Sequence, residues 1–407
     1  MNILEQLSQP DIWQDFLNYK LEKQHLTSLE QKSLTDFIKN KRFSNAVFLS
    51  DPSFCPPLPV KKEINKEGSL KKRIVYSYPE DFSFLLKLTA FLLYRYDTLF
   101  ADNCYAFRRN YGVTDAIKRL RLTKGLSDKY CLKVDIHNYF NSINVPLLLE
   151  KLTFLKKEDA SLYRLFEKLL SADAAMENGT LIKEKRGAMA GTPISPFFAN
   201  VYLMETDLYF AERNLLYFRY SDDILLFADT KSELLSLQTV LYEQLASHGL
   251  TLNPEKVKLS RPHEPIDFLG FSYHDGQIDL SENSLRKIKG KIRRKAHALR
   301  RWQKKKGLSE DKAAKGFIHA MNCKFYARED TDSFTFSRWF FPNLTTEEGL
   351  KKIDAYMQQY IRYTVTGRHS KSNYRIRYEQ LKEWGYRSLV HEYFAAIQTD
   401  TSEQSHL

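Results

Sequence analysis

Cysteine is scarce in this chain of 407 residues, which contains four. Cys55, Cys104, Cys131 and Cys323 lie far apart and form no Cys-x-x-Cys pair, so a disulfide scaffold and a zinc site are both disfavoured. No stretch approaches about 18 uninterrupted apolar residues, which argues against a membrane span. The first residues are not basic and no apolar run follows them, so we expect no signal peptide, no membrane partner and a cytoplasmic location.

Basic residues outnumber acidic ones, with 62 Lys and Arg against 50 Asp and Glu and a net charge of +12 at pH 7. Hydrophobic residues make up 43% of the chain and aromatic residues 14%, which is enough for a core and excludes global disorder. The length predicts two or three structural units. The charge favours a polyanionic partner, although charge alone identifies none.

The periodicity of apolar residues changes along the chain. Helical spacing over 3–42 predicts two or three helices, and the prolines of 51–59 predict an extended connector. Between 130 and 271 short β-type runs alternate with helical runs, which is typical of an α+β layer with a central sheet. From residue 281 onwards the chain is expected to be helical, and 286–306 contains twelve Lys or Arg and no acid.

Carboxylates occur inside two apolar β-type segments. Alternation over 131–137 predicts a strand that buries one face and presents Asp135 on the other. Two further runs, 216–220 and 224–228, flank Ser221–Asp223 and predict a tight hairpin with adjacent aspartates at its tip. A chain of this composition contains about six adjacent acidic pairs by chance, so an Asp-Asp pair alone is weak evidence of a site. The evidence here is that the pair lies between two apolar β-type runs. Converging carboxylates could hold two divalent ions about 4 Å apart.

Seven segments follow, in order, the motifs of reverse transcriptases. Lys133–Ile143 resembles their first carboxylate motif, D-I-x-x-F/Y-F-x-S-I, and Tyr220–Asp223 resembles their Y-x-D-D box. The other segments are 71–73, 105–109, 191–203, 252–256 and 268–271. Single motifs mislead, but an ordered set is specific. The chain therefore resembles bacterial reverse transcriptases of the group II intron and retron-like lineage.

This resemblance implies an α+β fold, a right-hand polymerase with fingers, a palm built on an antiparallel sheet, and a helical thumb followed by C-terminal helices. The predicted parts are an N-terminal helical extension (1–50), fingers (51–130), a palm (131–278) with a fingers insertion near 150–186, a basic helical thumb (279–345) and a C-terminal helical region (346–407).

The resemblance also implies catalytic roles. Asp135, Asp222 and Asp223 are the expected catalytic carboxylates, with Asp135 and Asp222 touching metal directly and Asp223 partly supporting them. The backbone carbonyl of Ile136 completes the metal shell. The expected cofactor is Mg²⁺, as two ions that activate the primer 3′-hydroxyl and stabilise the leaving pyrophosphate, and Mn²⁺ can substitute.

Other motif positions are expected to bind the incoming nucleotide. Lys71 and Arg73 hold the triphosphate. Phe140 is the steric gate that favours deoxynucleotides, with simple core packing as the alternative. Lys256 protonates the leaving group or is an ordinary surface lysine. Gly191 lies in the box that contacts the nucleotide.

One position departs from the family pattern. The residue before Gly191 is usually Gln and here is Ala190. Because that Gln normally contacts the nucleotide, fidelity, processivity and template dependence are open. Such variation resembles the defence-associated reverse transcriptases of the abortive-infection and unknown groups.

Beyond the nucleotide site, three regions are candidates for contact with nucleic acid. Phe268, Leu269 and Gly270 form a primer grip, or else their apolar side chains are core. The basic helix favours sequence-independent contact with a template–primer backbone. Near the C-terminus, Trp384 and Tyr386 either stack on structured RNA or pack in the core. The residues of the basic helix expected to bind nucleic acid are Arg293, Arg294, Arg300, Arg301 and Trp302.

The sequence thus predicts an RNA-directed DNA polymerase that copies a dedicated structured noncoding RNA into DNA from dNTPs, in antiphage defence. Two alternatives stay open: a protein-primed or template-independent DNA polymerase of abortive-infection type, and a catalytically silent RNA-binding protein. A homo-oligomer or an accessory effector protein is a further possible partner.

Overall fold

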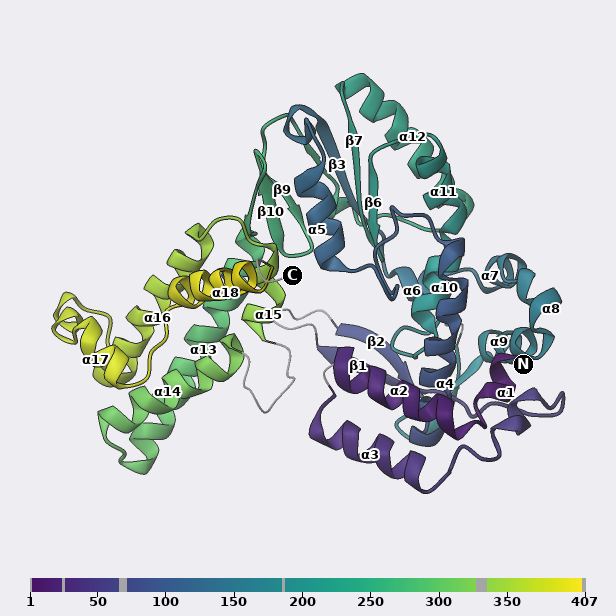
Figure 1. Cartoon of the computed structure of the whole chain (residues 1–407), viewed down its shortest axis with the longest axis horizontal. Coiled ribbons are helices and arrows are strands. Elements are labelled where there is room, and N and C mark those ends of the chain that lie inside the picture. The colour runs from purple at the N-terminus through teal and green to yellow at the C-terminus, as the bar shows by residue number, and fades with distance from the viewer. Residues whose placement is uncertain (1, 24–25, 66–71, 185–186, 327–334, 405–407) are drawn as a thin grey trace. The chain divides into compact units, whose positions relative to one another are not determined.

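The structure, a computed structural model, describes residues 2–23, 26–65, 72–184, 187–326 and 335–404 (Figure 1). By their contacts the residues divide into two units. Unit 1 comprises 1–116 and 128–264, and unit 2 comprises 117–127 and 265–407. The division into five parts predicted above stays a prediction. No helix in the described part of the chain is long and apolar enough to cross a membrane.

The central sheet of unit 1 has the strand order β6-β7-β3-β8 and is antiparallel throughout. In β3 the side chains of Leu132 and Val134 are fully buried on the face that α12 covers, as the alternating pattern predicts. The opposite face carries Lys133 and Asp135. The strands are β3 (Tyr130–Asp135), β6 (Tyr217–Tyr220), β7 (Asp223–Ala228) and β8 (Lys258–Ser260).

A second sheet of unit 1 has the order β2-β1-β4-β5. The strands β1 and β2 form an antiparallel pair, and β1 meets β4 in parallel at Val60 and Met176. The chain between β1 and β2, which includes Lys71, lies outside the described residues. The strands are β1 (Val60–Asn65), β2 (Lys72–Ser77), β4 (Ala174–Glu177) and β5 (Thr180–Lys183).

Helices surround both sheets, and their ends follow ordinary capping chemistry. Thr27 and Glu30 form a capping box at the start of α3, and the Asp159 carboxylate caps α9 by accepting from Leu162 N. The helices of unit 1, with α5 continuing into unit 2, are α1 (Ile3–Gln6), α2 (Pro10–Lys23), α3 (Ser28–Lys39), α4 (Glu80–Leu92), α5 (Val113–Leu122), α6 (Tyr139–Ser142), α7 (Val145–Lys151), α8 (Phe154–Glu158), α9 (Ala160–Ser171), α10 (Ser195–Tyr202), α11 (Met204–Glu212) and α12 (Lys231–Ser247), with 3₁₀ turns η1 (Ala46–Ser50), η2 (Leu93–Leu99) and η4 (Pro254–Lys256).

The N-terminal helices pack through aromatic side chains. The Trp13 ring lies 5.1 Å from the Phe37 ring and 5.4 Å from the Phe43 ring, and its indole donates to Leu7 O at 2.7 Å. Phe16 contacts Phe91 of α4 at 5.4 Å between ring centroids. These contacts join residues 3–43 to the core of unit 1.

Unit 2 combines a small sheet with helices. The sheet has the order β11-β10-β9, and the basic helix predicted over 286–306 is α13, which Ser281 caps and Gly307 ends with a φ of 62°. Its elements are β9 (Ile266–Phe268), β10 (Phe271–His274), β11 (Gln277–Leu280), α13 (Glu282–Lys306), α14 (Glu310–Phe325), α15 (Phe336–Phe340), α16 (Glu348–Thr366), α17 (Tyr378–Glu383) and α18 (Leu389–Gln404), with 3₁₀ turns η3 (Leu126–Asp128), η5 (Phe341–Asn343) and η6 (Lys371–Arg375).

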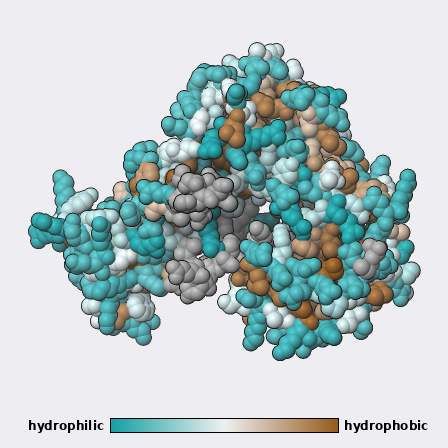
Figure 2. Space-filling view, viewed as in Figure 1, coloured by the Kyte–Doolittle hydropathy of each residue, from teal (hydrophilic) through white to brown (hydrophobic). Residues whose placement is uncertain are grey.

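The surface drawn in Figure 2 is mostly hydrophilic, with hydrophobic residues in separate patches. Trp384 and Tyr386, for which stacking on RNA and core packing were both open, are 8% and 5% exposed. The Tyr386 hydroxyl donates to Asp354 at 2.7 Å, and the Trp384 indole donates to Asp311. Both aromatic rings are therefore part of the core of unit 2.

Candidate active site

The two adjacent aspartates lie on the β6–β7 hairpin, as predicted. Tyr220 pairs with Asp223, so the loop is Ser221–Asp222, one residue shorter than the predicted tip. Ser221 adopts a φ of 60° because a two-residue hairpin loop needs a left-handed residue to match the twist of its strands. Asp223 is the first residue of β7 because it pairs on both sides, with Tyr220 and with Asp135 of β3.

Backbone hydrogen bonds fix the third aspartate beside the hairpin. Asp135 ends β3, and the next amide, Ile136 N, donates to Asp222 O at 2.9 Å. The Asp135 carbonyl accepts from Asn253 N at 2.9 Å. All three carboxylates therefore lie at one end of the central sheet, although Asp222 and Asp223 are about 90 residues from Asp135.

Two lysines neutralise part of this negative charge. Lys256 Nζ lies 2.6 Å from Asp135 Oδ2, and Lys133 Nζ lies 3.2 Å from Asp223 Oδ1. Sequence reasoning missed Lys133. Its position two residues before Asp135 could have indicated it, because residues i and i+2 of a strand share a face and Lys133 is diagonal to Asp223 across the β3–β7 pair.

Burial raises the pKa of both hairpin aspartates. For Asp222 the nearby Asp135 carboxylate raises the pKa further, while the positive charges of Lys256 and Arg73 oppose this effect. For Asp223 the chief opposing influence is Lys133. A cation placed among these carboxylates would remove the repulsion that the fold imposes on them.

The oxygen donors at this end of the sheet suit a hard divalent cation. Asp135 and Asp222 offer carboxylates. Ile136, which follows Asp135 and donates its amide to Asp222 O, offers a backbone carbonyl. Within the described ranges no group of three or more His, Cys, Asp or Glu side chains forms a complete metal site.

A strained loop packs against α6, the short helix that follows Asp135 and Ile136 in the chain. Gly187, Met189 and Gly191 have φ values of 54°, 56° and 99°. A side chain at position 187 would come within 2.6 Å of Phe140 O, so only glycine fits there. Ala190 is 4% exposed, and its backbone accepts from Tyr76 N of β2 at 2.8 Å. Ala188 N donates to Phe140 O at 2.8 Å, so the loop connects β2 to α6.

Of the other predicted nucleotide-binding residues, Gly191 belongs to this loop and Phe140 contacts it. Phe140 is half-buried, and its ring lies 5.9 Å from the exposed ring of Phe107. Arg73 is exposed on β2 and close enough to lower the pKa of Asp222. Lys256 is 50% exposed and paired with Asp135. Gly191 packs against Tyr76, where an added Cβ would lie 3.0 Å from the Tyr76 carbonyl.

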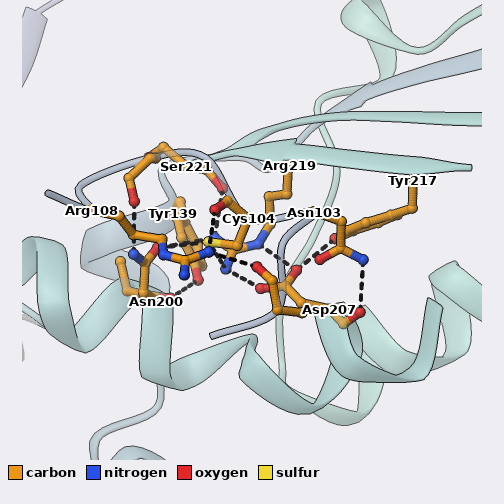
Figure 3. Close-up of polar contacts among 12 residues, drawn as sticks. Asn103, Cys104, Arg108, Tyr139, Asn200, Asp207, Tyr217, Arg219 and Ser221 are labelled. Carbon is orange, nitrogen blue, oxygen red and sulfur yellow. Dashed lines mark hydrogen bonds and ion pairs between the residues drawn. The ribbon is translucent and has the colours of Figure 1, made fainter. Parts of the chain in front are cut away.

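A buried ion pair between Arg219 and Asp207 supports the β6–β7 hairpin and was not predicted (Figure 3). Arg219 and Asp207 are both fully buried, and the guanidinium donates to both carboxylate oxygens, from Nε at 2.7 Å. Arg219 Nη1 also donates to Ser221 O at 3.4 Å, and Tyr217 donates its hydroxyl to Asp207 at 3.1 Å. Burial acts to lower the pKa of Arg219, whereas the nearby Asp207 carboxylate acts to raise it. The net result is a raised pKa for Arg219.

Unit 2 contains the predicted primer grip. Leu269 and Gly270 form a two-residue loop between β9 and β10 with φ values of 53° and 94°. Phe268 is 1% exposed, so its side chain is core, which was the alternative interpretation. The close approach at Gly270 is made within unit 2, since Ser284 Oγ donates to Gly270 O at 2.7 Å.

The predicted nucleic-acid contacts on α13 differ in availability. Arg293, Arg294 and Arg301 are exposed, and Trp302 is 48% exposed. Arg300, in contrast, donates to the carbonyls of Thr364 and Val365 at 3.1 and 2.9 Å, so its guanidinium joins α13 to α16.

An antiparallel sheet with one aspartate on a central strand and two on the adjoining hairpin defines the palm of a nucleotide polymerase. The chain belongs to the reverse transcriptase (RNA-dependent DNA polymerase) family, which matches residues 64–273. This match confirms the predicted family and the predicted α+β, right-hand polymerase fold class. Members of this family generally use divalent metal ions.

The chain is similar to individual proteins at low sequence identity. The retron Ec86 reverse transcriptase of Escherichia coli is 24% identical over 174 residues, 42% of this chain and 50% of that protein. The chain therefore spans about half the length of this curated relative. An apo telomerase of Candida tropicalis truncated from its C-terminal domain is similar with a TM-score of 0.43 and 16% identity, over 55% of each chain. Telomerase of Candida albicans in complex with a TWJ fragment of telomeric RNA has a TM-score of 0.43 and 13% identity, over 87% of this chain and 68% of that one.

Proposed function

We propose that this protein is an RNA-directed DNA polymerase that uses Mg²⁺ and synthesises DNA on an RNA template. The observation that carries the proposal is the hydrogen bond from Ile136 N to Asp222 O, which brings Asp135 and the Asp222–Asp223 pair to one end of the palm sheet. A fold without catalytic work would have no reason to bury these mutually repelling carboxylates together.

In this proposal Asp135, Asp222 and the carbonyl of Ile136 would hold two Mg²⁺ ions, and Asp223 would support them from β7. Bound metal supplies activation of the primer 3′-hydroxyl and stabilisation of the leaving pyrophosphate. The chain itself contributes positive charge. Arg73 would contact the triphosphate, and Lys256, which is paired with Asp135, would face the leaving phosphates.

Phe140 is the proposed sugar gate. Its half-buried ring, backed by Phe107, would lie against the 2′-carbon of the incoming nucleotide and exclude a 2′-hydroxyl. The exposed residues Arg293, Arg294, Arg301 and Trp302 of α13 would bind the template–primer backbone. Leu269 and Gly270 are the residues left to contact the primer, because Phe268 is buried.

A primer-extension assay tests the proposal. A DNA primer annealed to an RNA template is incubated with labelled dNTPs and Mg²⁺, and DNA synthesis is expected from the native protein. Asp222→Asn should abolish it, whereas Asp229→Asn should not, because Asp229 lies at the far end of β7 and is 74% exposed. Synthesis by Asp222→Asn at the native rate, or none by the native protein, would reject the proposal.

Ala190 favours a second candidate, a protein-primed or template-independent DNA polymerase. Its buried methyl group offers no hydrogen bond to a nucleotide, and its amide is held by Asn141 Oδ1 at 3.1 Å. The same assay without template separates the two candidates, since labelled DNA or labelled protein would then form from dNTPs alone.

We further propose that the template is a dedicated structured noncoding RNA and that the cDNA acts in antiphage defence, alone or with an effector protein. The similarity to a retron reverse transcriptase supports this role. Sequencing the RNA and DNA that copurify with the protein tests the template. Phage plating on cells that carry the native gene or Asp222→Asn tests the defence role, and equal plating efficiencies would refute it.

A further inference from the structure

The short helix that carries Phe140 depends on other parts of unit 1 for its position. This helix, α6, comprises Tyr139–Ser142 and follows Asn138, which adopts a left-handed φ of 47°. A single helical turn is unstable alone, because its nucleation fixes several backbone dihedral angles for few hydrogen bonds. The position of the Phe140 ring is therefore set by the contacts that join α6 to its neighbours.

One contact joins α6 to α10. The Tyr139 hydroxyl donates to Ala199 O at 2.5 Å, and the Tyr139 side chain is 2% exposed. The ring of Phe140 is next to that of Tyr139, with 5.7 Å between their centroids. One contact does not fix the orientation of a helix, so the contacts that α6 makes elsewhere also determine where Phe140 lies.

The loop of residues 187–191 makes two such contacts, and one of them requires a particular side chain. Ala188 N donates to Phe140 O at 2.8 Å, a bond between two backbones. Ala190 N donates to Asn141 Oδ1 at 3.1 Å, a bond that needs an acceptor on the side chain at position 141. Because Ala190 is 4% exposed, loss of this acceptor would leave a buried amide without its partner.

The loop and α6 are packed closely enough that a shift in one moves the other. A Cβ at position 187 would lie 2.6 Å from Phe140 O and 2.8 Å from Asn141 O. On its other side the loop is held by β2, since Tyr76 N donates to Ala190 O at 2.8 Å. The Asn141 side chain thus completes a hydrogen-bonded connection between β2 and the helix that carries Phe140.

We propose that Asn141 is a positioning residue for the sugar gate. By accepting from Ala190 N, its side chain holds α6 where the Phe140 ring distinguishes deoxynucleotides from ribonucleotides. This inference rests on the proposed function, because it requires that Phe140 is the gate of a DNA polymerase. Asn141 acts through Phe140 and is assigned no contact with the substrate or with metal.

Competition between rNTP and dNTP in the primer-extension assay tests the inference. Asn141→Leu keeps the size of the side chain and removes the acceptor. It should raise the ratio of ribonucleotide to deoxynucleotide incorporation roughly 2–12-fold, the factor that corresponds to the net contribution of one hydrogen bond. Asn141→Ala removes the same acceptor without an apolar branch and should behave in the same way, so the test does not depend on the folding of one variant.

Asn141→Asp is the conservative variant, because a carboxylate can still accept from Ala190 N. It should keep the incorporation ratio within about twofold of the native value. Its added charge acts equally on both kinds of triphosphate and cancels in the ratio. A loss of folded protein cancels too, so a merely structural role of Asn141 would leave the ratio unchanged in every variant.

A double variant shows whether Asn141 acts through Phe140. Phe140→Ala removes the gate, so adding Asn141→Leu to it should change the incorporation ratio by less than about twofold. The matched control is Asn144→Leu, which removes an exposed amide that accepts from Leu147 N at the start of α7. This control should keep the native ratio, because its amide does not contact the loop.

Hydrogen exchange at the Ala190 amide reports the bond itself and needs no synthesis. Exchange should be faster in Asn141→Leu than in the native protein and remain slow in Asn141→Asp. Unchanged exchange, or an unchanged incorporation ratio in Asn141→Leu when Phe140→Ala raises it, would overturn the inference and leave the proposed function intact. Absence of DNA synthesis by the native protein would reject the proposed function and this inference with it.

Discussion

Replacing Asp207 with asparagine should destabilise the catalytic hairpin strongly. The change keeps the shape of the side chain but leaves the Arg219 guanidinium charged in a site where both partners are fully buried. Removing one partner of a buried ion pair costs roughly 3–5 kcal/mol, because the remaining charge is uncompensated. We expect the upper part of this range, since Arg219 also donates to Ser221 O and cannot move away without disturbing the hairpin loop.

Hydrogen exchange measured on peptides that cover 217–228 reports the local free energy of opening. Asp207→Asn should lower it by about 3–5 kcal/mol, and Arg219→Met should lower it similarly. The double variant should cost less than the sum of the two, because it leaves no unpaired charge.

The pair Lys183–Asp173 provides a control, because its side chains are 87% and 63% exposed. Asp173→Asn should change the free energy of unfolding by no more than about 1 kcal/mol. If Asp207→Asn also cost less than about 1 kcal/mol, the reasoning from burial would be refuted.

Three further outcomes are expected. Phe140→Ala should raise ribonucleotide incorporation roughly 10–200-fold in a folded enzyme, measured by competing rNTP against dNTP, and unchanged selectivity would place Phe140 in the core. Lys256→Met should lower the Mg²⁺ concentration needed for half-maximal synthesis, because Lys256 competes with metal for Asp135, and a higher requirement would contradict this role. Burial lowers the pKa of His248 in the folded protein. Its contribution to the free energy of unfolding is therefore complete above about pH 6.5. Below that pH the contribution decreases as the pH decreases, because the unfolded chain takes up the proton more readily than the folded protein. His248→Gln should therefore lose less stability than the native protein between pH 7 and 5 in urea titrations, and equal losses would argue against it.

Local patterns predicted much of the fold. Alternation in 131–137 predicted β3 and the position of Asp135 on the face opposite Leu132 and Val134, and the run of basic residues predicted α13. The hairpin was predicted, but Asp223 was placed in its loop, because the sequence does not show that Asp135 pairs with it across the sheet. Patterns of this kind describe residues that are neighbours along the chain. They therefore predict the features that depend on a single strand or helix.

Contacts between distant segments could not be predicted in the same way. Lys133 and Asp223 meet only after β3 and β7 pair, and the Arg219–Asp207 pair needs α11 to pack beneath β6. Arg300 was expected to bind nucleic acid, yet its guanidinium donates to the Thr364 carbonyl of α16, a contact that depends on how α13 and α16 pack. A charged residue in a sequence does not reveal whether solvent, a ligand or a distant carbonyl will satisfy it.

The first turn of the chain has a consequence for synthesis on the ribosome. Ile3 N donates to Asp159 Oδ2 at 2.7 Å, and this carboxylate is 5% exposed. At translation rates of about 5–20 residues per second, the partner of Ile3 is made roughly 8–30 s after Ile3 itself. The aromatic contacts of Trp13 with Phe37 and Phe43 can form early, but α1 must wait for residue 159. The α1 helix is thus made among the first residues but cannot reach its final place until residue 159 has been made.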